Sequence, residues 1–196
     1  MKWAYWAAIA VLGCGPRSTP DGPPDGGQVI EDAGRILRVE RVADVERIVD
    51  GDTLVVRAGP EVLTPDGRPL DGERVRLLGV DTPELRTPDG PECFAVEAQR
   101  LAIAELDGRR ITLQFDETRC RPPQDVAACR GDFGRLLAYI EYQSADDQPE
   151  VFNEVLLRTG HAAVLRGSRF RHRQSARYDE LERTALMAGL GLWACP

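Results

Sequence analysis

Lysine is almost absent from this chain of 196 residues, since Lys2 is the only one and the other 24 basic residues are arginines. Arginine can hold a phosphate through two parallel hydrogen bonds, but biased genomic composition produces the same excess, so the excess alone indicates no function. Long hydrophobic runs are missing too: no run reaches the roughly 20 residues that a spanning helix needs, which excludes a polytopic membrane protein. The net charge of −7 speaks against a protein that coats nucleic acid non-specifically, although an enzyme needs positive charge only at its site.

The first residues predict an export signal. Lys2 precedes an apolar stretch, residues 3–12, that has the length of a signal-peptide core and is too short to cross a bilayer. This stretch ends in Val-Leu-Gly-Cys, which resembles the lipobox of bacterial lipoproteins, where cleavage leaves Cys14 as a lipid-bearing first residue that anchors the protein to a membrane. An ordinary secretory signal with an incidental cysteine is the alternative. The expected organisation is a signal peptide at 1–13, a flexible Pro/Gly-rich tether at 14–33 and one folded domain at 34–196.

Cysteine usage also indicates an oxidising compartment. Without Cys14 the chain keeps Cys93, Cys120, Cys129 and Cys195, an even number that predicts two disulfides. Four cysteines allow three pairings, and the sequence does not choose among them. The short loop between Cys120 and Cys129 favours the local pair, which leaves Cys93 for Cys195. A zinc site is disfavoured because the chain has no Cys-x-x-Cys spacing and its two histidines lie elsewhere.

The order of secondary structure predicts a small barrel followed by helices. Five segments are rich in β-branched residues or alternate as strands do, and an Asp-Gly turn joins the first two. They are Val39–Val49, Thr53–Arg57, Glu73–Val80, Ile111–Phe115 and Leu136–Tyr142. Three segments show apolar residues at helical spacing, namely Phe94–Ala102, Val151–Leu156 and Tyr178–Leu186. This pattern predicts an α+β fold, a five-stranded barrel of OB type with three α-helices.

Acids and arginines gather in three segments of this barrel. They are Ile48–Thr53 at the first hairpin turn, Val75–Glu84 from the third strand into a loop, and Gly131–Ile140 at the fifth strand. In these segments the chain closely resembles the staphylococcal nuclease (thermonuclease) family, with supporting matches at Phe152–Gly160 and Gly191–Trp193. The resemblance extends from Val39 to Trp193, and segments in this order and at this spacing are hard to reach by chance. It implies the same OB-type barrel with three helices and calcium-dependent hydrolysis of phosphodiester bonds in DNA and RNA.

The resemblance also implies roles for single residues. Asp52 and Asp81 take the places of carboxylate ligands of Ca²⁺, and Thr82 offers its backbone carbonyl. Calcium suits such a set because it accepts hard oxygen ligands in flexible geometry. Asp52 could instead be a turn residue that bonds its own backbone, which is the common role of an isolated Asp-Gly-Asp-Thr.

Three further positions correspond to the catalytic groups of the family. Glu84 becomes the general base for the attacking water, and Arg76 and Arg135 become the clamp on the phosphate. A phosphodiester gains negative charge on its equatorial oxygens as the fifth bond forms, and planar guanidiniums meet two such oxygens together. Taken singly, either arginine could merely pair with a surface acid.

The chain departs from the family at positions that touch the substrate. Asp132 and Phe133 replace a lysine and a tyrosine that contact a second phosphate in the family, and Arg166 replaces a tyrosine that lies over a base. Phe133 can still stack but cannot donate a hydrogen bond. These changes predict weaker or altered substrate affinity with the cleavage chemistry retained.

One dense basic run remains. It consists of Arg166, Arg169, Arg171, Arg173 and Arg177. By the family's order this run lies before the last helix on the substrate side of the barrel, where it could form a rim that follows the phosphates. The equally weighted alternative is a solvated loop and helix start.

The function predicted from the sequence is therefore an exported, lipid-anchored nuclease that acts on DNA or RNA as a monomer without a protein partner. The first alternative is a non-catalytic OB-fold module that binds nucleic acid on the cell envelope. The second is a structural calcium-binding domain, which would need the acids but neither Arg76 nor Arg135.

Overall fold

The computed structural model describes residues 39–122, 125–167 and 171–196. The predicted signal peptide, the tether, the lipidation site Cys14 and the substrate-binding candidate Arg169 lie outside the described residues.

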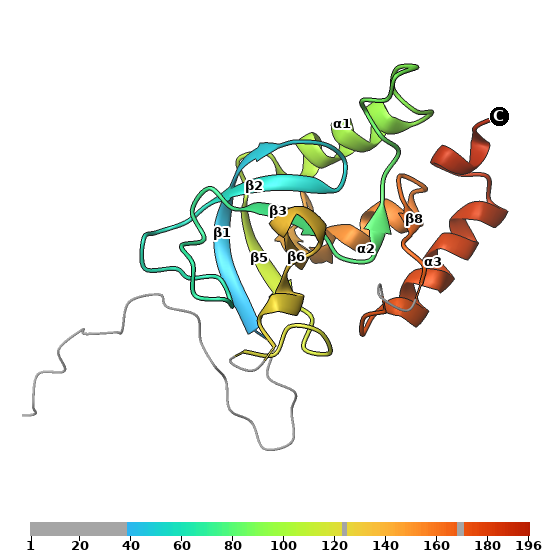
Figure 1. Cartoon of the computed structure of the whole chain (residues 1–196). Coiled ribbons are helices and arrows are strands. Elements are labelled where there is room, and N and C mark those ends of the chain that lie inside the picture. The colour runs from blue at the N-terminus through green and yellow to red at the C-terminus, as the bar shows by residue number, and fades with distance from the viewer. Residues whose placement is uncertain (1–38, 123–124, 168–170) are drawn as a thin grey trace, which may run out of the picture.

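Five strands form a closed barrel (Figure 1). They are β1 (Val39–Ile48), β2 (Thr53–Arg57), β3 (Arg74–Leu77), β5 (Arg110–Phe115) and β6 (Leu136–Gln143). Their order is β3-β2-β1-β5-β6, and a parallel pairing of β3 with β6 closes the ring. The predicted five-stranded α+β barrel is confirmed, and its inward side chains, such as Leu54, Val75 and Leu113, are almost wholly buried.

Three short strands accompany the barrel. β7 (Pro149–Val151) extends the sheet beside β6, and β4 (Val80–Asp81) pairs with β8 (Ala163–Val164). β7 and β8 were not predicted, because two or three residues are too few to show a period of two. The predicted strand Glu73–Val80 is divided, since β3 ends at Leu77 and β4 begins at Val80. The β4–β8 pair matters for the site, since it holds Asp81 beside the segment that leads into the arginine run.

The described residues contain three α-helices, as predicted. They are α1 (Ala95–Leu106), α2 (Phe152–Arg158) and α3 (Ser175–Met187). α2 packs against β6, and α3 packs on the outer side of α2 (Figure 1). Short 3₁₀ turns lie between β5 and β6, at η1 (Ala127–Cys129) and η2 (Asp132–Gly134), and after α3, at η4 (Gly191–Ala194). In the described ranges no helix is both long and apolar enough to span a membrane.

Two disulfides hold segments outside the barrel. Cys93 is joined to Cys195 with the Cα atoms 6.1 Å apart, which ties the start of α1 to the C-terminal end. Cys120 is joined to Cys129 with the Cα atoms 4.5 Å apart, which closes the connection between β5 and β6. These are the two pairs that the spacing favoured.

Asn153 fastens α2 to the barrel. Its side chain is fully buried. Its Oδ1 accepts from the Ile140 N–H at 3.0 Å, and its Nδ2 donates to the Leu78 carbonyl at 3.1 Å and to the Ala138 carbonyl at 3.4 Å. The side chain therefore links α2 to β6 and to the segment that follows β3.

Asn153→Ala is expected to lower the free energy of unfolding by about 2–4 kcal/mol, because it leaves buried backbone groups without partners. Urea denaturation measures this change. The control is Arg158→Ala in the same helix, which removes an exposed ion pair between Arg158 and Glu150 of β7. This substitution should lower the free energy of unfolding by at most about 1 kcal/mol. Equal losses in the two variants would contradict the role given to Asn153.

Candidate active site

Asp52 lies at the end of the β1–β2 turn and is 1% exposed. Its Oδ2 accepts from the Thr82 N–H at 2.8 Å and from the Thr82 hydroxyl at 3.0 Å, while its Oδ1 accepts from the Thr53 hydroxyl at 3.1 Å. Gly51 permits this approach, since a Cβ there would lie 2.8 Å from Thr82 Cγ2 and 2.9 Å from Ala98 Cβ. The turn is thereby joined to the segment after β4.

Arg76 bridges the two carboxylates that were predicted to bind calcium. Its Nη1 donates to Asp52 Oδ1 and its Nη2 to Asp81 Oδ1, and Nη2 also reaches the Val80 carbonyl at 3.2 Å. The Arg76 side chain is 11% exposed. The structure thus brings Asp52, Arg76, Asp81 and Thr82 together.

Burial outweighs the ion pair and the hydrogen bonds that stabilise the charge of Asp52. Burial raises the pKa of Asp52 to about 7, Asp50 adds to the rise, and Arg76 and the Thr82 N–H oppose it. A cation beside this carboxylate would favour its ionised form, so the hard oxygen donors of Asp52, Asp81 and Thr82 fit Ca²⁺ chemically. Among the described residues no group of three or more His, Cys, Asp or Glu side chains is arranged to hold a metal. A calcium ion here would therefore need waters and a backbone carbonyl to complete its shell.

Glu84 lies exposed on the loop after β4, and its backbone is held by Glu92. The Glu84 N–H donates to Glu92 Oε2 at 2.7 Å, and the Glu92 N–H donates to the Glu84 carbonyl at 2.9 Å. Cys93, joined to Cys195, follows directly. Sequence reasoning missed Glu92, because no motif or helical spacing relates residues eight positions apart across a loop.

Arg135 immediately precedes β6 and shares a face of the sheet with Arg76. Arg76 pairs with Leu137 in the parallel β3–β6 register, and alternate side chains of a strand lie on one face, so Arg135 and Leu137 point the same way. The Nε of Arg135 is buried and has no hydrogen-bond partner among the described residues. Its Cζ lies 5.8 Å from the centre of the Phe133 ring, and Phe133 itself is 94% exposed.

The sequence model of the family described as "Staphylococcal nuclease homologue" matches residues 74–195, which is more than half of the chain. This chain belongs to the staphylococcal nuclease family. The match begins at β3 and includes the segments that carry Arg76, Asp81, Glu84 and Arg135.

Similar proteins agree with this family. A thermonuclease of Staphylococcus intermedius is 34% identical over 119 residues, which cover 60% of this chain and 56% of that protein. A thermonuclease of Staphylococcus hyicus is 26% identical over 189 residues, covering 96% of this chain and 92% of its relative. An uncharacterized protein of Methanocaldococcus jannaschii is 29% identical over 166 residues, covering 76% and 70%. Together these comparisons support a nuclease at the level of the family.

The arginine run of this nuclease homologue is largely engaged with its own acids. Arg166 is paired with Glu182 and, at 3.3 Å, with Asp179. Arg173 donates to Glu117 at 2.8 Å and to Gln114 at 3.0 Å.

Two more members of the arginine run, Arg177 and Arg171, differ in their contacts. Arg177 lies 3.2 Å from Glu154, whereas Arg171 is exposed. A phosphate-binding rim stays a prediction, and it would require Arg166 and Arg173 to leave these partners. Phe133, by contrast, is exposed and lies beside Arg135.

Proposed function

We propose that this chain is a calcium-dependent nuclease that hydrolyses phosphodiester bonds of DNA or RNA. The observation that supports this most is the meeting of Asp52, Asp81 and Arg76 on the face of the barrel that Arg135 shares. Isolated ion pairs are common on protein surfaces, but here Arg76 joins a nearly buried carboxylate to a second carboxylate in a chain of the nuclease family, and Arg135 lies on the same face of the sheet.

Asp52 and Asp81 would hold the ion through their carboxylates and Thr82 through its carbonyl. Bound calcium supplies positive charge against a phosphate oxygen and lowers the pKa of a bound water. Pro83 supports this arrangement, because a proline pushes the preceding residue out of the helical region and so restricts the direction of the Thr82 carbonyl.

Arg76 and Arg135 would bind the non-bridging phosphate oxygens. A guanidinium stays ionised at any working pH and offers paired donors in one plane. Arg76 would exchange one of its present carboxylate contacts for a phosphate oxygen. The Nε of Arg135 has no hydrogen-bond partner among the described residues, but it is buried, so its contact with a phosphate would require the side chain to move.

Glu84 would act as the general base and accept a proton from the attacking water. Its exposed side chain is free to meet a substrate, while the two backbone hydrogen bonds to Glu92 fix where the loop holds it. General-base catalysis contributes typically 10²–10⁴-fold to a rate.

Cleavage of single-stranded DNA and of RNA by the purified protein is expected to require calcium, and magnesium should replace it poorly. Magnesium demands near-octahedral geometry at short distances, whereas calcium accepts the irregular arrangement expected of a site with few protein ligands. Product formation on gels, with each metal and with excess chelator, measures this. Full activity in chelator would overturn the metal assignment. Binding without cleavage in saturating calcium would favour the non-catalytic binding module.

We also propose export, with a signal peptide at 1–13, a tether at 14–33 and a lipid anchor on Cys14. The two disulfides support an oxidising destination. Cys14→Ser is expected to move the protein from the membrane fraction to the soluble fraction, since it removes the site of acylation. Immunoblots of both fractions measure this, and a variant that still sediments with membranes would rule out the anchor.

A further inference from the structure

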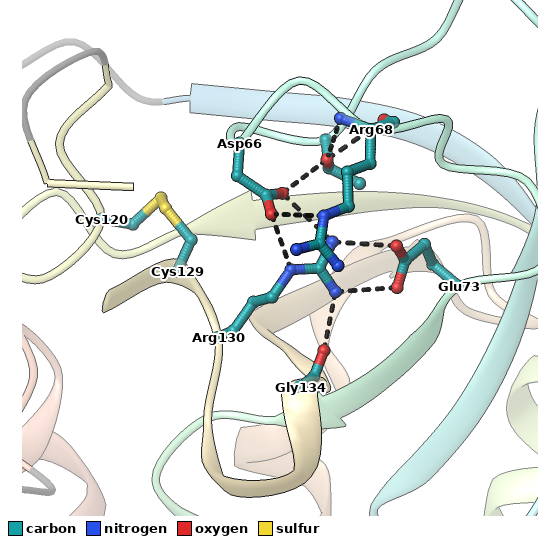
Figure 2. Close-up of polar contacts among 8 residues, drawn as sticks. Asp66, Arg68, Glu73, Cys120, Cys129, Arg130 and Gly134 are labelled. Atoms are coloured by element: carbon teal, nitrogen blue, oxygen red, sulfur yellow. Dashed lines mark hydrogen bonds and ion pairs between the residues drawn. A yellow bond between two sulfur atoms is a disulfide. The ribbon is translucent and has the colours of Figure 1, made fainter. Parts of the chain in front are cut away.

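Arg130 uses all five guanidinium N–H groups as hydrogen-bond donors (Figure 2). Nε and Nη2 donate to the two oxygens of Asp66 at 2.8 and 3.1 Å, and Nη1 and Nη2 donate to the two oxygens of Glu73 at 2.9 and 2.8 Å. Nη1 also donates to the Gly134 carbonyl at 2.7 Å. The Arg130 side chain is 10% exposed. A fully engaged guanidinium holds its partners at fixed relative positions, because its donors lie in one rigid plane.

Two of these partners, Glu73 and Gly134, lie next to the segments that carry the phosphate clamp. Glu73 directly precedes β3, the strand of Arg76, and Gly134 directly precedes Arg135 and β6. One guanidinium therefore connects the starts of both strands, next to the point where their parallel pairing begins.

The loop before β6 has a backbone that needs such support. Phe133 has φ 66° and Gly134 has φ 72°, so two successive residues are left-handed, and phenylalanine disfavours that region. Two hydrogen bonds close the loop, from the Gly131 N–H to the Arg135 carbonyl at 2.9 Å and from the Gly134 N–H to the Gly131 carbonyl at 3.1 Å. The contact of Arg130 with Gly134 orients the peptide that leads directly into Arg135.

The surroundings of Arg130 keep this contact in place. The disulfide between Cys120 and Cys129 ends at the residue before Arg130 (Figure 2). The hydrogen bonds from Arg130 lower the pKa of Asp66 to about 2, so Arg130 stabilises the ionised form of this carboxylate. Arg68 lies 3.3 Å from the same carboxylate but is 65% exposed.

We propose that Arg130 is a positioning residue for phosphodiester hydrolysis, which sets the spacing between Arg76 and Arg135 by fixing the loop Gly131–Arg135 against Glu73 and Asp66. This inference rests on the function proposed above. A displacement of about 1 Å in a catalytic group can lower a rate by about 10²-fold, so the spacing of two arginines on one phosphate is a sensitive property.

The first test compares Arg130→Met, Arg130→Lys and the control Arg68→Met, which loses an arginine on the same Asp66 without touching the loop. We expect Arg130→Met to lower kcat for single-stranded DNA by roughly tenfold or more. Arg130→Lys should recover little, because an ammonium cannot make the two paired contacts. Arg68→Met should keep kcat within twofold. An equal loss in Arg68→Met and Arg130→Met would overturn the proposal.

A double-mutant cycle separates positioning from general destabilisation. Arg130 acts through Arg135, so Arg130→Met in an Arg135→Met background should lower the residual kcat less than twofold. The same fold loss in both backgrounds would overturn the proposal. If Arg130→Met does not fold, Arg130→Lys goes through the same cycle with the same criteria.

Hydrogen exchange gives a readout that does not depend on activity. The amides of Gly131 and Gly134 should exchange faster in Arg130→Met than in the wild type or in Arg68→Met. Unchanged exchange in an active protein would overturn only the role of Arg130. A wild-type protein that cleaves neither DNA nor RNA with calcium would overturn the function on which the proposal rests, so the two failures are distinguishable.

Discussion

Glu84→Gln is expected to lower kcat by roughly 10²-fold or more while calcium affinity changes little. The amide keeps the size and shape of the carboxylate but cannot accept the proton of the attacking water. The hydrogen bonds that hold residue 84 come from its backbone and from Glu92, so the substitution leaves the loop in place. Steady-state cleavage of a short fluorescent oligonucleotide measures kcat, and calorimetry measures calcium binding.

The matched control for this variant is Asp89→Asn, since Asp89 is an exposed acid in the same loop. It should keep kcat within a factor of two. Near wild-type kcat in Glu84→Gln, or an equal loss in Asp89→Asn, would contradict the assignment of Glu84 as the base. Glu92→Ala should lower kcat less than Glu84→Gln does, because it loosens the position of Glu84 without removing the carboxylate.

Arg135→Lys is expected to lower kcat by roughly 10²-fold, although the charge is conserved. A lysine ammonium is a point charge and cannot place two donors on two phosphate oxygens at once. Lost stabilisation of charge that grows in the transition state appears in kcat more than in KM. Kinetics on the same oligonucleotide separate the two parameters.

Arg57→Lys provides the comparison, because Arg57 is exposed at the end of β2. Its kcat should equal that of the wild type within twofold. A loss confined to KM in Arg135→Lys would mean that Arg135 binds substrate and transition state equally, which would contradict a role in stabilising the transition state.

The barrel and its helices could be predicted because their signals are local. The Asp50-Gly51 turn between two β-rich segments predicts a hairpin on its own, and the structure places β1 and β2 there. The apolar spacing around Ala98 predicts α1 in the same way. By contrast, β4 and β8 form through a pairing between Val80 and Val164 that neither segment reveals by itself.

The candidate site also has features that local sequence predicts and features that depend on contacts between distant segments. The candidates Asp52, Asp81, Glu84, Arg76 and Arg135 could be named through the family resemblance, because its motifs each lie within one short stretch of chain. The contacts of Arg166 and Arg173 with acids on other segments could not. An ion pair depends on the distance between side chains in space, and sequence separation does not determine that distance.

By itself the sequence determined the fold class and the order of the five barrel strands and three helices, because periodicity and turn residues act over a few neighbouring positions, and its resemblance to the nuclease family supplied the candidate site residues. Only the tertiary structure decided which side chains meet. Arg76 bridges Asp52 and Asp81, and Glu92 holds the backbone of Glu84. Arg130 joins Asp66, Glu73 and Gly134. Arg130 lies 57 and 64 positions from its two carboxylate partners. Closure of the barrel through the β3–β6 pairing brings these segments together, and local sequence carries no information about contacts that depend on closure.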